Sequence, residues 1–134
     1  MCLLDAVVDW SAQAITCRAC SHADPANPLR AADRLGAATG IEYAAQAMAV
    51  HGALLASVDQ APRQGYLTSV RSVTLHVDRL DTLPGPLAVQ AERLSGDGNH
   101  ILYQFALSHA GTVLLEGRAA VVLDASTVDS KTPT

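Results

Sequence analysis

The sequence contains few charged and few aromatic residues. Only 16% of its 134 residues are Asp, Glu, Lys or Arg, and only 4% are Phe, Trp or Tyr, whereas about 25% charged residues is usual for a soluble chain. Because 49% of the residues are hydrophobic, this shortage of charge excludes a disordered linker. The net charge of −4 excludes the basic face of a nucleic-acid-binding domain or of a polybasic membrane-surface module. We expect one domain at residues 1–123 and a flexible tail at residues 124–134.

Cysteine is also scarce, and the chain has only Cys2, Cys17 and Cys20. An odd number of cysteines without a secretory signal predicts free thiols in a reducing compartment, and therefore a cytoplasmic protein. Cys17 and Cys20 have the CxxC spacing of zinc and redox sites, but a structural zinc site commonly needs a second such pair. The segment has the pattern of a strand, in which residues three apart point to opposite faces. We therefore interpret both as packing cysteines.

The common cofactor and nucleophile motifs are missing from the sequence. It contains no GxGxxG, GxxxxGK[ST], HExxH or GxSxG, which removes the support for a nucleotide cofactor, a metalloprotease site or a hydrolase elbow. The five histidines are not spaced as metal ligands, so we expect neither a metal nor a cofactor. His51 is interpreted as a core or interface residue, and the surface is the expected place for His76, His100 and His109.

The residue pattern predicts two strands, a loop, one long helix and four further strands. The strands are expected at Leu3–Trp10 and Ala14–Ser21, and the loop at His22–Arg34, which contains two prolines. Residues Leu35–Val58 are rich in Ala, Leu and Met, which favours a helix. Apolar residues then alternate in four runs that contain Val73, Leu87, Ile101 and Val113, the pattern of an antiparallel meander.

This order of elements predicts an α+β fold in which one antiparallel sheet packs on one helix. The helix is apolar nearly all round, so we expect it to be buried on several sides. One helix covers only part of a six-stranded sheet. The uncovered edge or face is therefore expected to meet another copy of the chain.

Glu42 is the only formally charged residue of the predicted helix. A buried carboxylate is usually paired, protonated or functional, but a glutamate in the first turns can also simply be stabilised by the helix dipole. Gln46 lies one turn later and is placed to hydrogen-bond Glu42. His22 lies in the loop before the helix. A loop histidine is more often solvated, but beside a buried glutamate it becomes a candidate acid–base partner.

Three segments carry a resemblance to a known family: Leu3-Leu4-Asp5, Gly40-Ile41-Glu42-Tyr43-Ala44-Ala45-Gln46, and Arg71-Ser72-Val73-Thr74-Leu75-His76-Val77-Asp78. Over about residues 3–123 the chain resembles the hotdog-fold β-hydroxyacyl-acyl carrier protein dehydratases, and within them the bacterial branch of aryl polyene-type pathways. The resemblance implies a curved sheet wrapped around one central helix, and two protomers joined edge to edge. It also implies an active site at their interface, with a histidine from one protomer and an acidic residue from the central helix of the other.

Carried over to this sequence, the resemblance makes Glu42 the helix carboxylate and His22 the histidine. The sequence departs from the better-known branch in three places. His22-Ala23-Asp24-Pro25 replaces His-Phe-Pro, the gap to Glu42 is longer, and Gly36-Ala37 stands where that branch has Pro-Gly. Relatives also carry a short segment with Pro and His ahead of the position at which this chain begins.

The implied reaction removes water from a 3-hydroxyacyl thioester to give a trans-2-enoyl thioester, without a metal or cofactor. Neutral His22 takes the α-proton, and Glu42 donates to the β-hydroxyl or positions a water on it. A backbone amide near Gly36 and Ala37 polarises the carbonyl, and Gln46 orients Glu42.

The resemblance further implies that the acyl group arrives on an acyl carrier protein or on CoA. Basic residues are then candidates for docking the carrier: Arg30, Arg34, Arg63 and Arg71. Apolar interface residues are candidates for an acyl tunnel, although each is more often simply core: Met48, Leu54 and Leu55.

Two alternatives remain open at the level of the sequence. The first is an acyl thioesterase, because the same fold hosts both reactions and thioesterases also place a carboxylate on this helix. The second is a catalytically silent acyl-binding or assembly subunit. An assay with an enoyl and a saturated thioester separates the three readings.

Overall fold

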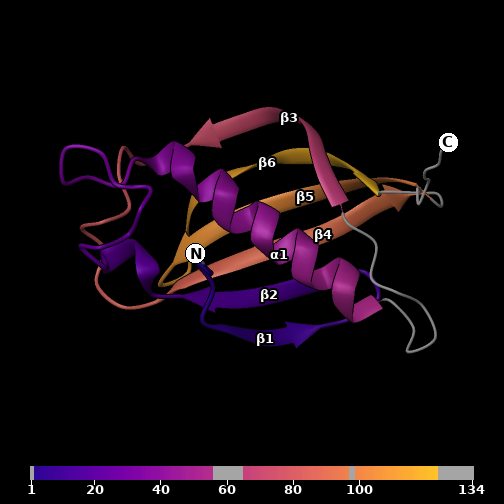
Figure 1. Cartoon of the computed structure of the whole chain (residues 1–134), viewed down its shortest axis with the longest axis horizontal. Helices are drawn as coiled ribbons and strands as arrows, with labels where there is room; N and C mark the ends of the chain where they lie inside the picture. The colour runs from indigo at the N-terminus through magenta and orange to yellow at the C-terminus, as the bar shows by residue number, and fades with distance from the viewer. Residues whose placement is uncertain (1, 56–64, 97–98, 124–134) are drawn as a thin grey trace, which may run out of the picture.

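The fold consists of one six-stranded sheet and one long helix (Figure 1). The structure is a computed structural model that describes residues 2–55, 65–96 and 99–123, and structural statements below refer to these residues. The elements in chain order are β1 (Ala6–Trp10), β2 (Ala14–Ala19), a 3-10 helix (Ser21–Ala23), a second 3-10 helix (Ala37–Thr39), α1 (Gly40–Leu55), β3 (Gly65–Leu75), β4 (Leu87–Gly96), β5 (His100–His109) and β6 (Thr112–Leu123).

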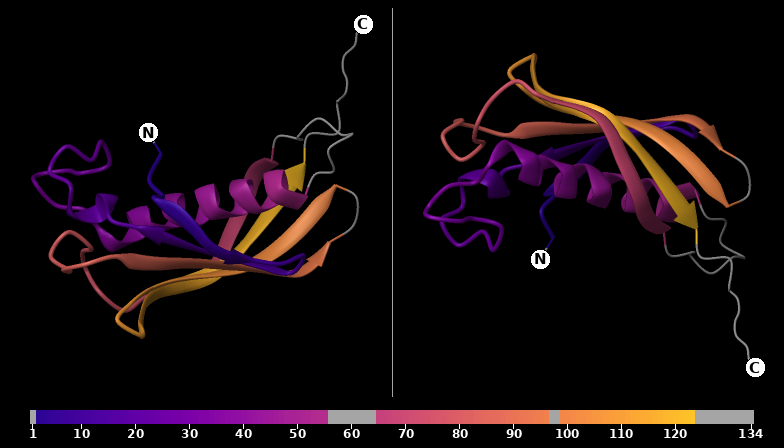
Figure 2. Two further views of the ribbon diagram at one scale, coloured as in Figure 1. Left: turned by 90° about the horizontal axis from the view of Figure 1, so that it is seen from below. Right: turned by 90° about the horizontal axis from the view of Figure 1, so that it is seen from above.

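The strands are ordered β1-β2-β4-β5-β6-β3, and every neighbouring pair is antiparallel. Helix α1 lies along one face of this sheet, which curves around it (Figure 2). The predicted α+β hotdog fold is therefore confirmed. Strands β1 and β3 are the two open edges of the sheet.

The curvature is strongest at β3, where the register to β6 shifts twice, between Leu67 and Ser69 and between Arg71 and Thr74. Ser72, inside the second shift, has a positive φ of 56°. Such irregularities bend a strand and increase its twist. They carry the β3 edge around the side of α1, as the right-hand view of Figure 2 shows.

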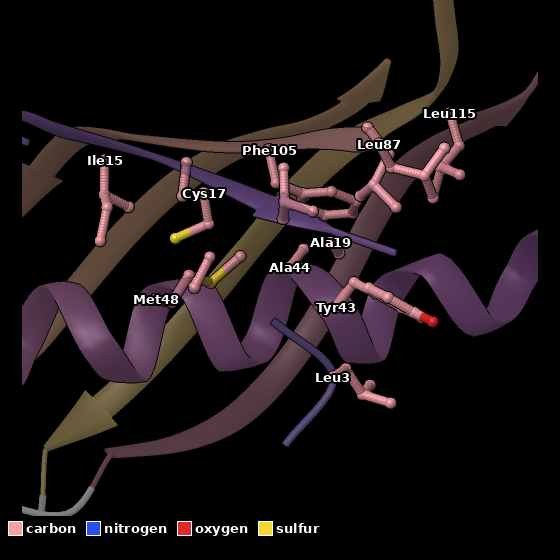
Figure 3. Packing of buried hydrophobic residues seen from close by; sticks show 14 of the residues in the cluster. Leu3, Ile15, Cys17, Ala19, Tyr43, Ala44, Met48, Leu87, Phe105 and Leu115 are labelled. Atoms are coloured by element: carbon pink, nitrogen blue, oxygen red, sulfur yellow. The ribbon is translucent and has the colours of Figure 1, made fainter. Parts of the chain in front are cut away.

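The core is built where the inward-facing residues of the central strands meet α1. Ile15, Cys17 and Phe105 point at the helix, whose Ala44 and Met48 pack against them (Figure 3). Burial raises the pKa of the Cys17 thiol, which is therefore an unreactive core group. Small residues on the helix allow this close approach: a Cβ added at Gly40 would lie 2.8 Å from Leu115 Cδ2.

Helix α1 begins five residues later than predicted, at Gly40 instead of Leu35. The main chain at Leu35 is paired elsewhere, since Leu35 O accepts a hydrogen bond from Leu80 N at 2.8 Å, and Ala37–Thr39 form a 3-10 turn. The first strand is also shorter than predicted, because it begins at Ala6 instead of Leu3. In the described residues no helix is long and apolar enough to cross a membrane.

Several predictions fall on residues that the structure does not describe. These are the end of the helix beyond Leu55, the centre of the turn at residues 96–99, Arg63, and the tail at residues 124–134.

Candidate active site

His22 is fully buried, with 0% of its surface exposed. It lies in the 3-10 helix Ser21–Ala23, directly after β2. Its Nε2 is 3.0 Å from the carbonyl oxygen of Leu83. A carbonyl can only accept a hydrogen bond, so Nε2 carries the hydrogen and the lone pair of the neutral ring lies on Nδ1. Nδ1 is buried and has no hydrogen-bond partner among the residues that the structure describes.

The surroundings of His22 favour its neutral form. Burial is the main cause that lowers its pKa below the ordinary 6.5, and the nearby His109 and Arg30 act in the same direction. The hydrogen bond to Leu83 O opposes them. At neutral pH His22 is therefore an uncharged imidazole with a free basic nitrogen, which is the form that a general base requires.

The loop between β3 and β4 also binds a second histidine, His109, which is the last residue of β5. His109 Nε2 donates to Pro84 O, the carbonyl next to that of Leu83, so His22 and His109 bind two successive carbonyls. Gly85, the following residue, has a φ of +78°, a conformation that glycine adopts without strain. His109 is half-buried, so the surface position predicted for it is only partly right.

The other buried histidine shows what a purely structural imidazole looks like in this chain. His51, on α1, lies 2.7 Å through Nδ1 from Tyr103 Oη and 2.8 Å through Nε2 from Ser11 O. Both ring nitrogens are engaged, which confirms the interpretation of His51 as a satisfied core residue. His22 differs in keeping one nitrogen free.

Arg30 holds the loop that carries His22. Its guanidinium donates to three main-chain carbonyls, those of Asp24 (2.9 Å), Asp33 (3.1 Å) and His22 (3.2 Å). Each of the three guanidinium nitrogens donates one of these bonds, which gives Arg30 a role in fixing this loop, and its expected part in docking a carrier protein stays a prediction. Arg34 and Arg71, in contrast, are exposed.

The segment just before α1, residues 35–37, is hydrogen-bonded through its main chain to residues 78–81. Ala37 N donates to Asp78 O at 2.9 Å, and Leu35 N donates to Asp81 Oδ1 at 3.0 Å. Arg79 forms an ion pair with Asp81 and holds the pKa of that carboxyl far below its usual range. The Ala37 amide is therefore already engaged and is not a donor for a substrate, which contradicts the prediction for this residue. Gly36 is exposed.

Glu42 lies in the first turn of α1 and is exposed within this chain, although the sequence predicted a buried carboxylate. The reason is that α1 is covered by the sheet on one side only. Its buried side consists of Gly40, Tyr43, Ala44, Ala47, Met48 and His51. Of the predicted tunnel residues, Met48 is buried in the core, and Leu54 is 37% exposed.

Gln46 is half-buried on α1, one turn after Glu42, and its predicted role in orienting Glu42 stays a prediction. Its Oε1 accepts a hydrogen bond from Leu3 N at 2.7 Å, and so ties the N-terminal segment to the helix. No hydrogen bond joins His22 to Glu42 within the described part of the chain. The structure thus brings His22 together with Leu83, Arg30 and His109, and leaves Glu42 facing outward.

Comparison with known proteins places this site in context. Residues 1–130 match the model of the ApeP-like family, described as ApeP dehydratase. Among solved structures, the chain is similar to the dehydratase heterocomplex ApeI:P from Xenorhabdus doucetiae, with a TM-score of 0.79 and 26% identity over 93% of this chain and 84% of that chain. No significant match was found among curated proteins.

Thioesterases share the fold at much lower identity. One from Haemophilus influenzae has a TM-score of 0.64 and 10% identity, over 87% of this chain and 76% of that chain. A mutant thioesterase from Pseudomonas aeruginosa has a TM-score of 0.59 and 14% identity, over 87% and 80%. At these identities the two thioesterases support the fold of this chain, and they do not show which reaction it catalyses.

Proposed function

This chain belongs to the ApeP-like dehydratase family, and we propose that it is a 3-hydroxyacyl thioester dehydratase. Its product is a trans-2-enoyl thioester, and its acyl group is carried by an acyl carrier protein or by CoA. The observation that carries the proposal is the buried, neutral His22 with a free Nδ1. We place the reaction in a lipid pathway of the fatty-acid or aryl polyene kind, in the cytoplasm.

His22 is the general base in this proposal. Its Nδ1 takes the proton from C2 of the substrate, and the electron pair of that C–H bond becomes the new C2–C3 double bond. The bond from C3 to the hydroxyl oxygen breaks, and the leaving oxygen takes a proton from the Glu42 carboxyl and departs as water. Returning the proton from His22 to Glu42, directly or through water, restores both groups, so that no metal or cofactor is consumed.

Within one chain Glu42 is exposed, whereas His22 is buried. The carboxylate that works with His22 therefore comes from a partner subunit in this proposal. Strand β3 is an open edge with large exposed apolar side chains at Tyr66, Leu67 and Leu75, which supports edge-to-edge pairing with a second subunit. In a pair of this kind, His22 of one subunit works with the helix carboxylate of the other. The Xenorhabdus structure is a heterocomplex, so the partner is either a second copy or a different subunit.

The carbonyl of the thioester requires a hydrogen-bond donor as negative charge develops on its oxygen. The amide of Ala37 is already bonded to Asp78 O. We therefore assign this role to the exposed Gly36 amide, just ahead of α1, where the helix dipole adds to its effect. The exposed arginines Arg34 and Arg71 remain the candidates for docking an acidic carrier protein.

The test is an assay of the purified chain, alone and with its partner subunit, on two thioesters. Hydration of a trans-2-enoyl thioester, followed through loss of the enoyl absorbance, measures the reverse dehydratase reaction. Release of free thiol from a saturated acyl thioester measures thioesterase activity. Hydration that is lost in His22→Ala and in Glu42→Gln supports the proposal, and hydration that persists in His22→Ala contradicts it.

A thioesterase is the second candidate, and the exposed Glu42 in the first turn of α1 is the observation that favours it. A carboxylate in this position can activate a water molecule for attack on the thioester carbonyl. Thiol release that depends on Glu42 and not on His22 would establish this reaction. Absence of both products, in a dimer that still binds acyl thioesters, would indicate a silent acyl-binding subunit.

A further inference from the structure

A continuous chain of hydrogen bonds joins Asn27, Tyr43, Ser21 and Leu3 next to the turn that carries His22. Asn27 Nδ2 lies 3.1 Å from Tyr43 Oη. Tyr43 Oη lies 2.7 Å from Ser21 Oγ, and Ser21 Oγ lies 2.7 Å from the carbonyl oxygen of Leu3. Three parts of the fold meet here: the N-terminal segment, the loop before the helix, and α1.

The direction of every bond in this chain follows from the chemistry of its ends. The Leu3 carbonyl can only accept, so the Ser21 hydroxyl donates to it. Ser21 Oγ then accepts the hydrogen of the Tyr43 hydroxyl, whose oxygen in turn accepts from the Asn27 amide. Burial raises the pKa of Tyr43, so its hydroxyl keeps the proton that this arrangement needs.

Asn27 is completely satisfied by its surroundings. Its amide nitrogen also donates to Ser21 O at 2.9 Å, and its Oδ1 accepts from Leu29 N at 2.9 Å. Asn27 is only 3% exposed and Tyr43 is fully buried. A buried polar group that loses its partner is costly, so the network resists any displacement of one member relative to the others.

The network acts on the residue immediately before His22. Both the carbonyl and the hydroxyl of Ser21 are held, the first by Asn27 and the second by Tyr43. Since Ser21 begins the 3-10 helix that carries His22, the network fixes where this short helix lies. It also ties that position to α1, because Tyr43 is the neighbour of Glu42 in the sequence.

We infer that Asn27 and Tyr43 are positioning residues for His22: through Ser21 they hold its imidazole against Leu83 O with Nδ1 free. This inference rests on the proposed role of His22 as the base. Neither residue has to touch the substrate, since both act through the main chain and side chain of Ser21.

Tyr43→Phe is the informative substitution, and Tyr103→Phe is its matched control. Each removes one buried hydroxyl, and Tyr103 hydrogen-bonds His51 at 2.7 Å, away from His22. We expect both variants to lower the denaturation midpoint. Only Tyr43→Phe should lower kcat for enoyl hydration, by about 10- to 100-fold, the scale on which misplacement by about 1 Å reduces catalysis. KM should change much less.

A second readout does not depend on catalysis. Side-chain nitrogen NMR of His22 in the protein without substrate reports its tautomer and its pKa. In the wild type and in Tyr103→Phe we expect the Nε2–H tautomer and a pKa below 6.5. In Tyr43→Phe and Asn27→Ala, a loosened turn should let the other tautomer appear and move the pKa toward 6.5.

The two readouts separate this inference from the proposed function. An unchanged His22 NMR signature in folded Tyr43→Phe and Asn27→Ala would overturn the positioning role, and so would an equal loss of kcat in Tyr43→Phe and Tyr103→Phe. If His22→Ala keeps its hydration activity, the proposed base is wrong. The NMR comparison then still decides whether the network positions the imidazole.

Discussion

The Nε2 of His22 and the carbonyl oxygen of Leu83 lie 3.0 Å apart, and this one contact determines which nitrogen of the imidazole is basic. The hydrogen stays on Nε2, and the lone pair stays on the buried Nδ1, which has no partner in the described part of the chain. His51, with both nitrogens engaged, cannot serve in this way. The contrast between these two buried histidines supports the proposal that His22 is the base.

His22→Gln should remove the base while keeping the main shape of the site. A glutamine amide can donate a hydrogen bond but has no basic nitrogen at neutral pH. General-base catalysis contributes about 10²- to 10⁴-fold, so we expect kcat to fall within that range, with a similar far-ultraviolet circular dichroism spectrum. The measurement is the initial rate of enoyl hydration. A rate within about threefold of the wild type, against the range expected for a lost base, would rule out His22.

Stability should depend on pH through the same residue. Burial holds the pKa of His22 below 6.5 in the folded chain, so the unfolded chain takes up the proton first as the pH falls. The free energy of unfolding should therefore decrease below about pH 6.5 and stop decreasing, as far as His22 contributes, below its folded-state pKa. Urea unfolding of the wild type and of His22→Gln at pH 7.5 and 5.5 tests this. The variant should lose less stability between the two values.

Arg30→Met should reduce turnover with every acyl donor. Arg30 binds three carbonyls of the loop that carries His22, and methionine offers no donor in its place. We expect about a tenfold lower kcat/KM, equivalent to about 1.4 kcal/mol, on a carrier-bound substrate and on a short soluble thioester alike. A loss restricted to the carrier-bound substrate would instead identify Arg30 as a docking residue.

The matched variant for this comparison is Arg34→Glu. Arg34 is exposed, and its charge is available to an acidic carrier protein. We expect this variant to raise KM for the carrier-bound substrate and to leave turnover of the short thioester unchanged, because rim charges act on encounter more than on chemistry. Equal kinetics of Arg34→Glu and the wild type on the carrier would remove this arginine from the docking surface.

Two glycine substitutions should change stability in opposite directions. Gly85 has a φ of +78° with open space around its Cα, so Gly85→Ala introduces backbone strain alone and should lower the free energy of unfolding by about 1–2 kcal/mol. Gly52 lies within α1 and also has open space. Gly52→Ala should raise the free energy of unfolding by about 0.5–1 kcal/mol. Chemical denaturation of both variants provides the measurement, and a loss of stability in Gly52→Ala would contradict the ordinary helical environment described for it.

The sequence contained enough to predict the order of the elements. Apolar residues alternate along the runs that contain Leu87 and Ile101, a pattern that predicts strands, and the structure has β4 and β5 at these positions. The start of α1 was predicted five residues early. Propensity alone favours a helix at Leu35, and the pairing of its main chain with Leu80 comes from a loop 45 positions away, which local sequence does not reveal.

The candidate site was only partly predictable, for two physical reasons. The contacts that fix His22 end on main-chain carbonyls, such as that of Leu83, and a carbonyl carries no signature in the residue type. The exposure of Glu42 depends on which side of α1 the sheet covers, and an apolar sequence on all sides of a helix leaves that open. Arg30 was predicted to bind a carrier protein because of its charge, whereas in the structure its planar guanidinium donates hydrogen bonds to three main-chain carbonyls.

The use of main-chain atoms at residues 83 and 84 has a consequence for how this site changes in evolution. His22 and His109 bind the carbonyls of Leu83 and Pro84, and every residue type supplies a carbonyl. These two hydrogen bonds therefore place no demand of their own on the side chains at residues 83 and 84. A single insertion or deletion between β3 and β4, however, would move both carbonyls at once. Both contacts therefore depend on the length of this loop, as well as on the positive φ that Gly85 supplies next to them.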